Sequence, residues 1–148
     1  MAKHTDGLVL NTIRPLITES RNPENDMDAK NSFYKNAFVN VPLNERGRLA
    51  VAGDGYVEFI NEDFASMNYA CAEHDALTDL FFAYNDTFNI LIDDCEDELL
   101  PADKVRHALE MARTYLQKAE DIHKPQIEKF IRLLELAQRT NMPVSFNL

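Results

Sequence analysis

The clearest hydrophobic pattern in the chain is helical and lies between Asp75 and Cys95. Large apolar residues recur there at the alternating three- and four-residue spacing of one helix face. They are Leu77, Leu80, Phe81, Tyr84, Phe88, Leu91, Ile92 and Cys95. At about 100° per residue these side chains span about 120° of arc, the width of a stripe that faces a core. The pattern therefore predicts one long amphipathic helix from about Asp75 to Cys95.

Two further helices are predicted in the C-terminal part of the chain. Pro101 and Pro125 each suit the first turn of a helix, and the second helix should end near Thr140, with Asn141 as its C-terminal cap. The first helix carries Val105, Ala108, Leu109, Ala112, Leu116 and Ala119, and the second carries Ile127, Phe130, Ile131, Leu134 and Ala137. The short connection between them predicts an antiparallel helix hairpin, followed by a short strand or packed tail at 144–146.

The first third of the chain has weaker patterns. Leu8 to Ile17 is a strand candidate, and Pro15 favours an edge position for it. Residues 18–32 are almost wholly polar, which is typical of an exposed loop.

The segment from Arg48 to Ile60 places two short β-prone runs around Gly53 and Gly55. Because glycine supplies the positive φ of tight turns, this segment predicts a β-hairpin. Asn61 then resembles a helix N-cap with two acidic residues after it, so a helix to about Ala72 should follow.

Together these elements predict an α+β fold in which a mostly helical C-terminal half packs on a small N-terminal β-hairpin or sheet. A length of 148 residues and a hydrophobic content of 45% suit a single domain over 1–148. No apolar run approaches the roughly 20 residues of a membrane span, and the N-terminus lacks the apolar stretch of a secretory signal. The two cysteines, Cys71 and Cys95, form no CxxC pair, so we expect a reducing, cytoplasmic environment.

The charges of the chain are strongly segregated. Between Leu49 and Asp103 there are 55 residues without Lys or Arg, and they hold fourteen of the 25 acidic residues. All fifteen basic residues lie outside this window, while the whole chain carries a net charge of −10. A surface of this kind attracts cationic partners and repels nucleic acid and anionic lipid. The sequence therefore predicts a basic protein partner, with no direct binding to nucleic acid or membrane.

The predicted long helix concentrates part of this charge opposite its apolar stripe. Asp75, Asp79, Asp86, Asp93 and Asp97 would lie within about 40° of one another. Phe82 and Ile90 stand four residues before and after Asp86, and apolar side chains ringed by charge are typical of protein interfaces. The alternative is an ordinary solvated face, with both apolar residues packed beneath the hairpin.

The candidate binding residues extend beyond this helix. Glu58, Glu62 and Asp63, with Tyr56, would enlarge the surface if the hairpin lies beside the helix, and Phe82 or Tyr84 would serve as aromatic anchors. The complete predicted set is Asp75, Asp79, Phe82, Asp86, Ile90, Asp93, Asp94, Asp97, Glu58, Glu62 and Asp63.

Motifs for catalysis or for a cofactor are weak. A calcium loop starting at Asp93 would place Cys95 at a ligand position and Lys104 at the twelfth, and it lacks the glycine at the sixth. Glu120 and His123 form a single Glu-x-x-His, whereas a carboxylate-bridged metal pair uses two. The sequence also lacks a nucleophile elbow and a phosphate-binding loop. We therefore predict no catalytic residue, metal or cofactor.

Three functions follow from these observations. The first is an inhibitor-like or immunity-like protein that neutralises or sequesters a basic partner. The second is a nucleic-acid mimic that occupies a nucleic-acid-binding protein, which requires carboxylates at phosphate-like spacing over a long surface. The third is a metal-dependent enzyme built on Asp and Glu, although the window has no Lys or Arg to hold an anionic substrate.

Overall fold

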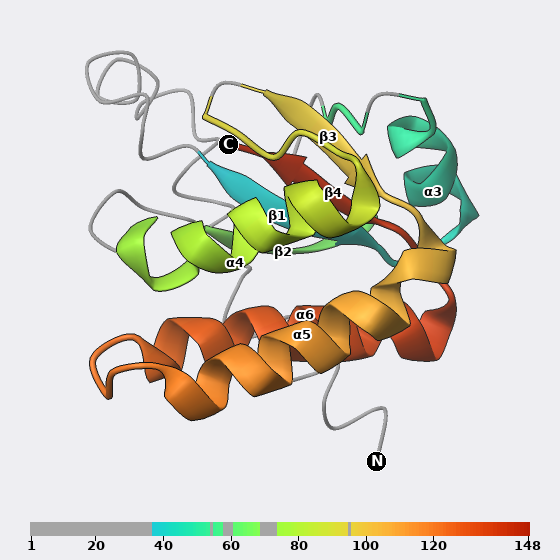
Figure 1. The fold of residues 1–148 in the computed structure, drawn as a ribbon. Coiled ribbons are helices and arrows are strands. Elements are labelled where there is room, and N and C mark those ends of the chain that lie inside the picture. Colours follow the sequence, from blue (N-terminus) through green and yellow to red (C-terminus); the bar gives the residue numbers. More distant parts are fainter. Residues whose placement is uncertain (1–36, 54, 58–60, 69–73, 95) are drawn as a thin grey trace, which may run out of the picture.

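Four antiparallel strands form one sheet in the order β2-β1-β4-β3 (Figure 1). The computed structural model describes residues 37–53, 55–57, 61–68, 74–94 and 96–148, with residues 74 and 75 described by their backbone alone. The strands are β1 (Phe38–Pro42), β2 (Phe64–Asn68), β3 (Asp97–Leu100) and β4 (Val144–Asn147). The sheet thus joins two strands from each half of the chain.

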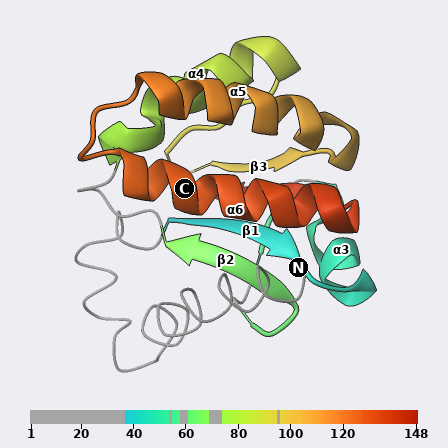
Figure 2. The same cartoon turned by 90° about the horizontal axis from the view of Figure 1, so that it is seen from below.

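Three long helices pack together beside this sheet (Figures 1 and 2). They are α4 (His74–Phe88), α5 (Val105–Lys118) and α6 (Lys124–Thr140). The 3-10 turn η4 (Ala102–Lys104) leads into α5, and the short helix α3 (Glu45–Val51) lies between β1 and β2 in the chain. The α+β class is therefore confirmed, with the helical C-terminal half packed on the sheet.

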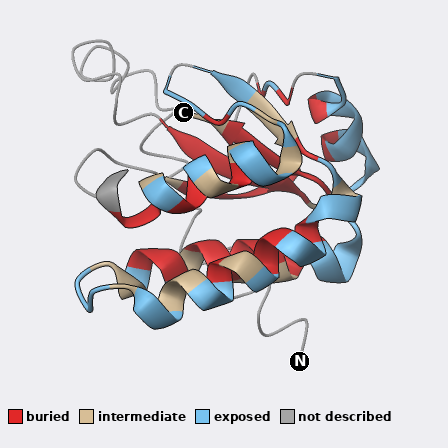
Figure 3. Ribbon diagram, in the orientation of Figure 1, coloured by how far each residue is buried: buried red, intermediate tan, exposed pale blue. Residues whose placement is uncertain are grey.

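The main core lies between the three long helices and one face of the sheet. Val39 of β1 and Phe146 of β4 point to this face, where the Phe146 ring meets Phe81 of α4 at a centroid distance of 5.3 Å. Phe130 of α6 meets Phe81 at 5.4 Å. Figure 3 shows the inward sides of the helices and the strands β1, β2 and β4 as mostly buried, whereas most of the edge strand β3 is exposed or half-buried. An aromatic cluster from α4, α6 and β4 thus fixes how the helices sit on the sheet.

The opposite face of the sheet combines a small apolar cluster with a polar row. Phe38 and Phe64 pack there with Val51 of α3. Asn40 faces Ser66 on one side and Ser145 on the other, and all three side chains are buried. Because side chains alternate along a strand, a slip of one residue would move these polar groups into the helical core. The polar row therefore favours the observed register.

Gly55 brings the segment after α3 against β4 and the edge strand β3. Its carbonyl oxygen accepts hydrogen bonds from the Ser145 hydroxyl and, at 3.1 Å, from Asn147 Nδ2. A Cβ at Gly55 would lie 2.7 Å from the Glu98 carbonyl oxygen, and the residue has a φ of 80°. Glycine is therefore required at this position by space and by backbone conformation.

The predicted helix hairpin is confirmed, although Pro101 precedes the 3-10 turn η4 instead of standing in the first turn of α5. Pro125 stands in the first turn of α6, and Asn141 ends that helix in the left-handed conformation with a φ of 56°. The tail at 144–146 forms β4 rather than a packed coil. Proline at the start and asparagine at the end of α6 were local signals strong enough to define it.

The long helix predicted to reach Cys95 is seven residues too long, because α4 ends at Phe88. Asn89 adopts the left-handed conformation with a φ of 55°, which asparagine tolerates better than most residues. Ile92 lies in the segment after the helix but is still buried. Its apolar side chain therefore fits the helical spacing and made the helix look longer than it is. Leu91, which the pattern assigned to the core, is 55% exposed.

The predicted β-hairpin at 48–60 is wrong, because its first run belongs to α3. The Asn44 side chain caps this helix by accepting a hydrogen bond from the backbone N–H of Gly47 at 2.8 Å. Glu45 in the first turn and Arg48 in the last turn complement the helix dipole. Gly53 and Gly55 do have positive φ, but they follow a helix instead of joining two strands.

The predicted helix from Asn61 to Ala72 is also wrong, because Phe64–Asn68 is β2. The Asn61 side chain accepts a hydrogen bond from the backbone N–H of Asp63 at 2.7 Å, and Phe64 N–H bonds back to the Asn61 carbonyl at 3.2 Å. This turn uses the same side-chain chemistry as an N-cap, which explains the misassignment.

The strand predicted at Leu8–Ile17, the loop at 18–32 and both cysteines lie outside the described residues. Within the described part of the chain, every helix is too short or too polar to span a lipid bilayer.

Candidate functional site

The outer side of α4 carries an exposed phenylalanine between two acidic residues. Phe82 is 56% exposed, and Asp79 and Asp86 stand three residues before it and four residues after it on the same helix. Residues at these spacings are neighbours on a helix surface. The three side chains point away from the core stripe of Leu77, Leu80, Phe81 and Tyr84. The structure thus confirms an exposed aromatic group flanked by carboxylates.

The segment that follows α4 is held against the helix by Asn85. Its Oδ1 accepts a hydrogen bond from the Ile92 N–H at 2.7 Å, and its Nδ2 donates one to the Ile92 carbonyl at 3.0 Å. On the other side of the segment, Glu98 Oε2 accepts the Leu91 N–H at 2.7 Å, while Glu98 Oε1 accepts the Leu99 N–H at 2.9 Å. Leu91 is therefore fixed in an exposed position by two side chains that bind backbone groups.

We define the acidic face as the exposed acidic residues of α4 and of the segment between α4 and β3, together with the exposed large apolar residues Phe82 and Leu91. Its members are Asp79, Phe82, Asp86, Leu91, Asp93, Asp94 and Glu96. Figure 3 shows this part of the molecule as largely exposed. None of the five acidic members forms an ion pair with a described residue. Their negative charge is thus available to a partner.

Within the described residues, the basic side chains of the neighbouring helix α5 form no ion pair with this face. Arg106 and Arg113 of α5 pair instead with Glu110 and with Glu135 of α6. Asp79 lies close enough to Tyr115 of α5 that its charge adds to the effect of burial in raising the pKa of that phenol. The negative potential of the acidic face therefore reaches the α4–α5 boundary.

Two apolar residues predicted at the binding surface have other roles. Ile90 is half-buried and packs against the main core. Tyr84 is fully buried, its hydroxyl donates a hydrogen bond to the Ala108 carbonyl at 2.6 Å, and burial raises its pKa. Of the predicted aromatic anchors, only Phe82 is therefore available to a partner.

The predicted row of five aspartates on one helix is not formed. Asp93 and Asp97 lie beyond the end of α4, and Asp97 begins β3 with its Oδ1 accepting a hydrogen bond from Asn147 Nδ2 at 2.7 Å. Asp75 falls within α4, but its side chain is not among those described. Asp94 is exposed beside Asp93 in the connecting segment, as a member of the acidic face.

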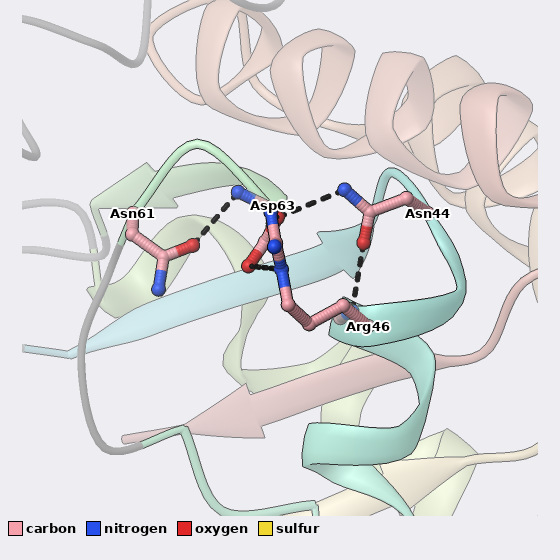
Figure 4. A network of polar contacts seen from close by, with 5 residues as sticks. Asn44, Arg46, Asn61 and Asp63 are labelled. Carbon is pink, nitrogen blue, oxygen red and sulfur yellow. Dashed lines mark hydrogen bonds and ion pairs between the residues drawn. The ribbon is translucent and has the colours of Figure 1, made fainter.

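Asp63, another predicted binding residue, is an internal structural group (Figure 4). Its carboxylate accepts hydrogen bonds from Arg46 Nε at 2.9 Å, from Arg46 Nη2 at 2.8 Å and from Asn44 Nδ2 at 2.8 Å, and only 8% of the residue is exposed. The bonds from Arg46 and then Asn44 hold the pKa of Asp63 below its ordinary value. This carboxylate therefore ties the start of α3 to the turn before β2.

We expect Asp63→Asn to destabilise the protein more at neutral pH than in acid. Because the folded-state pKa of Asp63 lies below its unfolded value of about 3.8, its contribution is present above that pH and is lost as the pH falls through the folded pKa. Urea unfolding of both proteins from pH 7 to pH 3 should show a difference in free energy that shrinks below about pH 4. Glu62→Gln, at the adjacent exposed acid, controls for the loss of one charge. A difference independent of pH would contradict this role.

Tyr56 and Glu62 are not brought to the acidic face. Val57 belongs to the apolar cluster on the far side of the sheet, so Tyr56 and its neighbours approach the sheet from the side opposite α4. Glu62 is exposed just before β2, at the other edge of the sheet from β3. Glu58 lies outside the described residues.

Four residues of the site are absent from the predicted binding set. Leu91 fitted the apolar stripe of a longer helix, and Asn85, Glu96 and Glu98 showed no pattern beyond being polar or acidic. The two positions after the end of α4 are occupied by Asn89 and Ile90, so no proline or glycine marks the end of the helix in the sequence. The only usable signal for the end of α4 was Asn85, a polar residue in the last turn of the helix.

No group of three His, Cys, Asp or Glu side chains within the described residues is arranged to hold a metal ion. Comparisons of the chain with known protein families, with curated proteins and with solved structures found no match. The geometry of the acidic face is therefore the basis for a functional proposal.

Proposed function

We propose that the protein binds a basic partner protein through the acidic face, and so neutralises or sequesters that partner. The observation that carries this proposal is the exposure of Phe82 between Asp79 and Asp86, carboxylates without an ion pair among the described residues. Transfer of a large aromatic side chain from water to an apolar environment is favourable, and an exposed Phe82 does not gain this free energy. Burial of Phe82 in a partner would recover that energy, since aromatic residues are frequent binding hot spots.

The carboxylates would act mainly on the rate and specificity of association. Charges on the rim of an interface steer encounter with an oppositely charged surface, whereas the buried apolar centre provides most of the affinity. The acidic face suits this division, because Asp79 and Asp86 flank Phe82 on α4 and the exposed Asp93 and Asp94 follow Leu91 closely in the chain. A cytoplasmic site of action, as predicted from the sequence, is part of this proposal.

The alternative of a nucleic-acid mimic has less support. A mimic needs an extended row of carboxylates at phosphate-like intervals. Asp79 and Asp86 are seven residues apart on α4, which corresponds to about 10 Å along a helix axis, longer than the spacing of adjacent phosphates. Since α4 ends at Phe88, the row does not continue along the helix.

The proposal is tested by measuring association at low and high salt. The immobilised protein should capture a basic protein from native lysate at about 0.05 M salt, and the association rate of the purified partner should fall steeply towards 0.5 M. Asp79→Asn with Asp86→Asn should reduce that rate about tenfold at low salt. Glu120→Gln with Glu128→Gln removes the same charge at exposed positions away from the acidic face and should leave the rate nearly unchanged. Salt-independent association, or capture of no basic protein, would overturn the proposal.

A further inference from the structure

We infer that Leu91 is a second apolar anchor of the acidic face, and that Asn85 and Glu98 act as positioning residues for it. This inference rests on the proposed function and extends it from one anchor to two. The partner that fits is a basic protein surface with apolar recesses for a phenylalanine and a leucine, flanked by Lys or Arg.

Leu91 lies on the Phe82 side of α4. Phe82 and Asn85 are three residues apart on the helix and are therefore surface neighbours. The Asn85 amide binds both backbone groups of Ile92, the residue next to Leu91. Ile92 is buried while Leu91 is 55% exposed, so the two side chains leave this segment on opposite sides. The backbone of Leu91 is thus held beside the helix surface that carries Phe82.

Side-chain hydrogen bonds hold the backbone of this segment in the unbound protein. Asn85 and Glu98 together satisfy the Ile92 N–H, the Ile92 carbonyl and the Leu91 N–H with bonds of 2.7 to 3.0 Å. Ordering a loop upon binding reduces affinity, and a loop that is already ordered avoids that loss. The same two polar side chains thus hold the backbone from which the exposed Leu91 projects.

Exposure alone does not distinguish Leu91, because single exposed apolar residues are common on protein surfaces. Ile122 is 80% exposed in the turn between α5 and α6, where Lys124 pairs with Asp121. That turn therefore contains a positive charge, unlike the acidic face. In addition, no described side chain binds the Ile122 backbone through a hydrogen bond. Leu91 differs in three respects: its segment is bonded to the helix that carries Phe82, Asp93 and Asp94, unpaired among the described residues, follow it closely in the chain, and two side chains bind its backbone N–H and the backbone of Ile92.

A double-mutant cycle with the captured basic partner tests the inference. Leu91→Ala should weaken binding about tenfold, mainly by faster dissociation. Asn85→Ala should weaken it by a smaller factor, and the double variant should bind no more weakly than Leu91→Ala alone, because Asn85 acts through Leu91. Asn85→Ala combined with Phe82→Ala should instead show the product of the two separate effects. Thr87→Ala, at an exposed position of the same helix, is the matched control.

Hydrogen exchange of the unbound protein gives a readout that does not depend on the partner. In Asn85→Ala the Ile92 amide should lose protection, while amides in the middle of α4 keep theirs. If the wild-type protein binds a basic partner but Leu91→Ala binds equally well, or the Asn85 and Leu91 effects multiply, this inference is wrong and the proposed function stands. If the wild-type protein binds no basic partner, both are wrong.

Discussion

Replacing Phe82 with alanine should weaken binding of the basic partner about thirtyfold or more and leave the fold intact. Truncation of an interface hot spot removes about 2 kcal/mol or more of binding free energy, which corresponds to that factor. Phe82 projects from the outer side of α4 and is 56% exposed, so its removal opens no cavity in the core. Dissociation constants measured by surface plasmon resonance or calorimetry, with thermal unfolding of each protein, would separate the two effects.

The chain provides a matched control for this prediction. Ile122→Ala also truncates an exposed apolar residue, but at the turn between α5 and α6 and away from the acidic face. Its affinity for the partner should remain within about twofold of the wild-type value. Equal losses in both variants would indicate a non-specific apolar contribution, and an unchanged affinity of Phe82→Ala would remove the anchor from the proposed function.

The C-terminal half of the fold was predictable because its helices are specified locally. Both α5 and α6 have regular apolar spacing; Pro101 precedes the 3-10 turn that leads into α5, Pro125 stands in the first turn of α6, and Asn141 ends α6. Signals of this kind are contained within one segment of sequence and need no distant partner. The boundaries were therefore correct to within a few residues, as was the short strand after them.

The N-terminal strands were not predictable in the same way. β2 pairs with β1, and β1 pairs with β4, a strand more than 100 residues further along the chain. Such pairing depends on contacts that no local pattern contains. Asn44 and Asn61 use similar side-chain chemistry, yet the first begins a helix and the second begins a turn before a strand. The difference is decided by tertiary structure, which places Asp63 against Arg46.

The candidate site was predicted in part. Charge segregation and helical spacing correctly brought Phe82, Asp79 and Asp86 to one exposed surface, since both depend only on sequence and helix geometry. Leu91 was misplaced because its exposure depends on where α4 ends. That end is fixed by the left-handed Asn89 and by a side-chain bond from Asn85, neither of which alters the apolar periodicity.

Phe130→Ala should destabilise the protein by about 3–5 kcal/mol, the range for a large aromatic residue removed from a core. Phe130 is fully buried, and its ring meets Phe81 at 5.4 Å, Tyr84 at 6.1 Å and Phe146 at 6.2 Å. It therefore contacts α4 and β4 from α6, and no single neighbouring side chain can move to fill the space that it leaves.

This loss is large because domains of this size have a net stability of only about 5–15 kcal/mol. Chemical denaturation should show a lower midpoint at an unchanged slope, and thermal unfolding should shift down by about 10 °C or more. Phe82→Ala makes the same chemical change on the exposed side of α4, so its midpoint should move little. A small shift for Phe130→Ala, or equal shifts for both variants, would contradict the placement of the aromatic cluster between α4, α6 and β4.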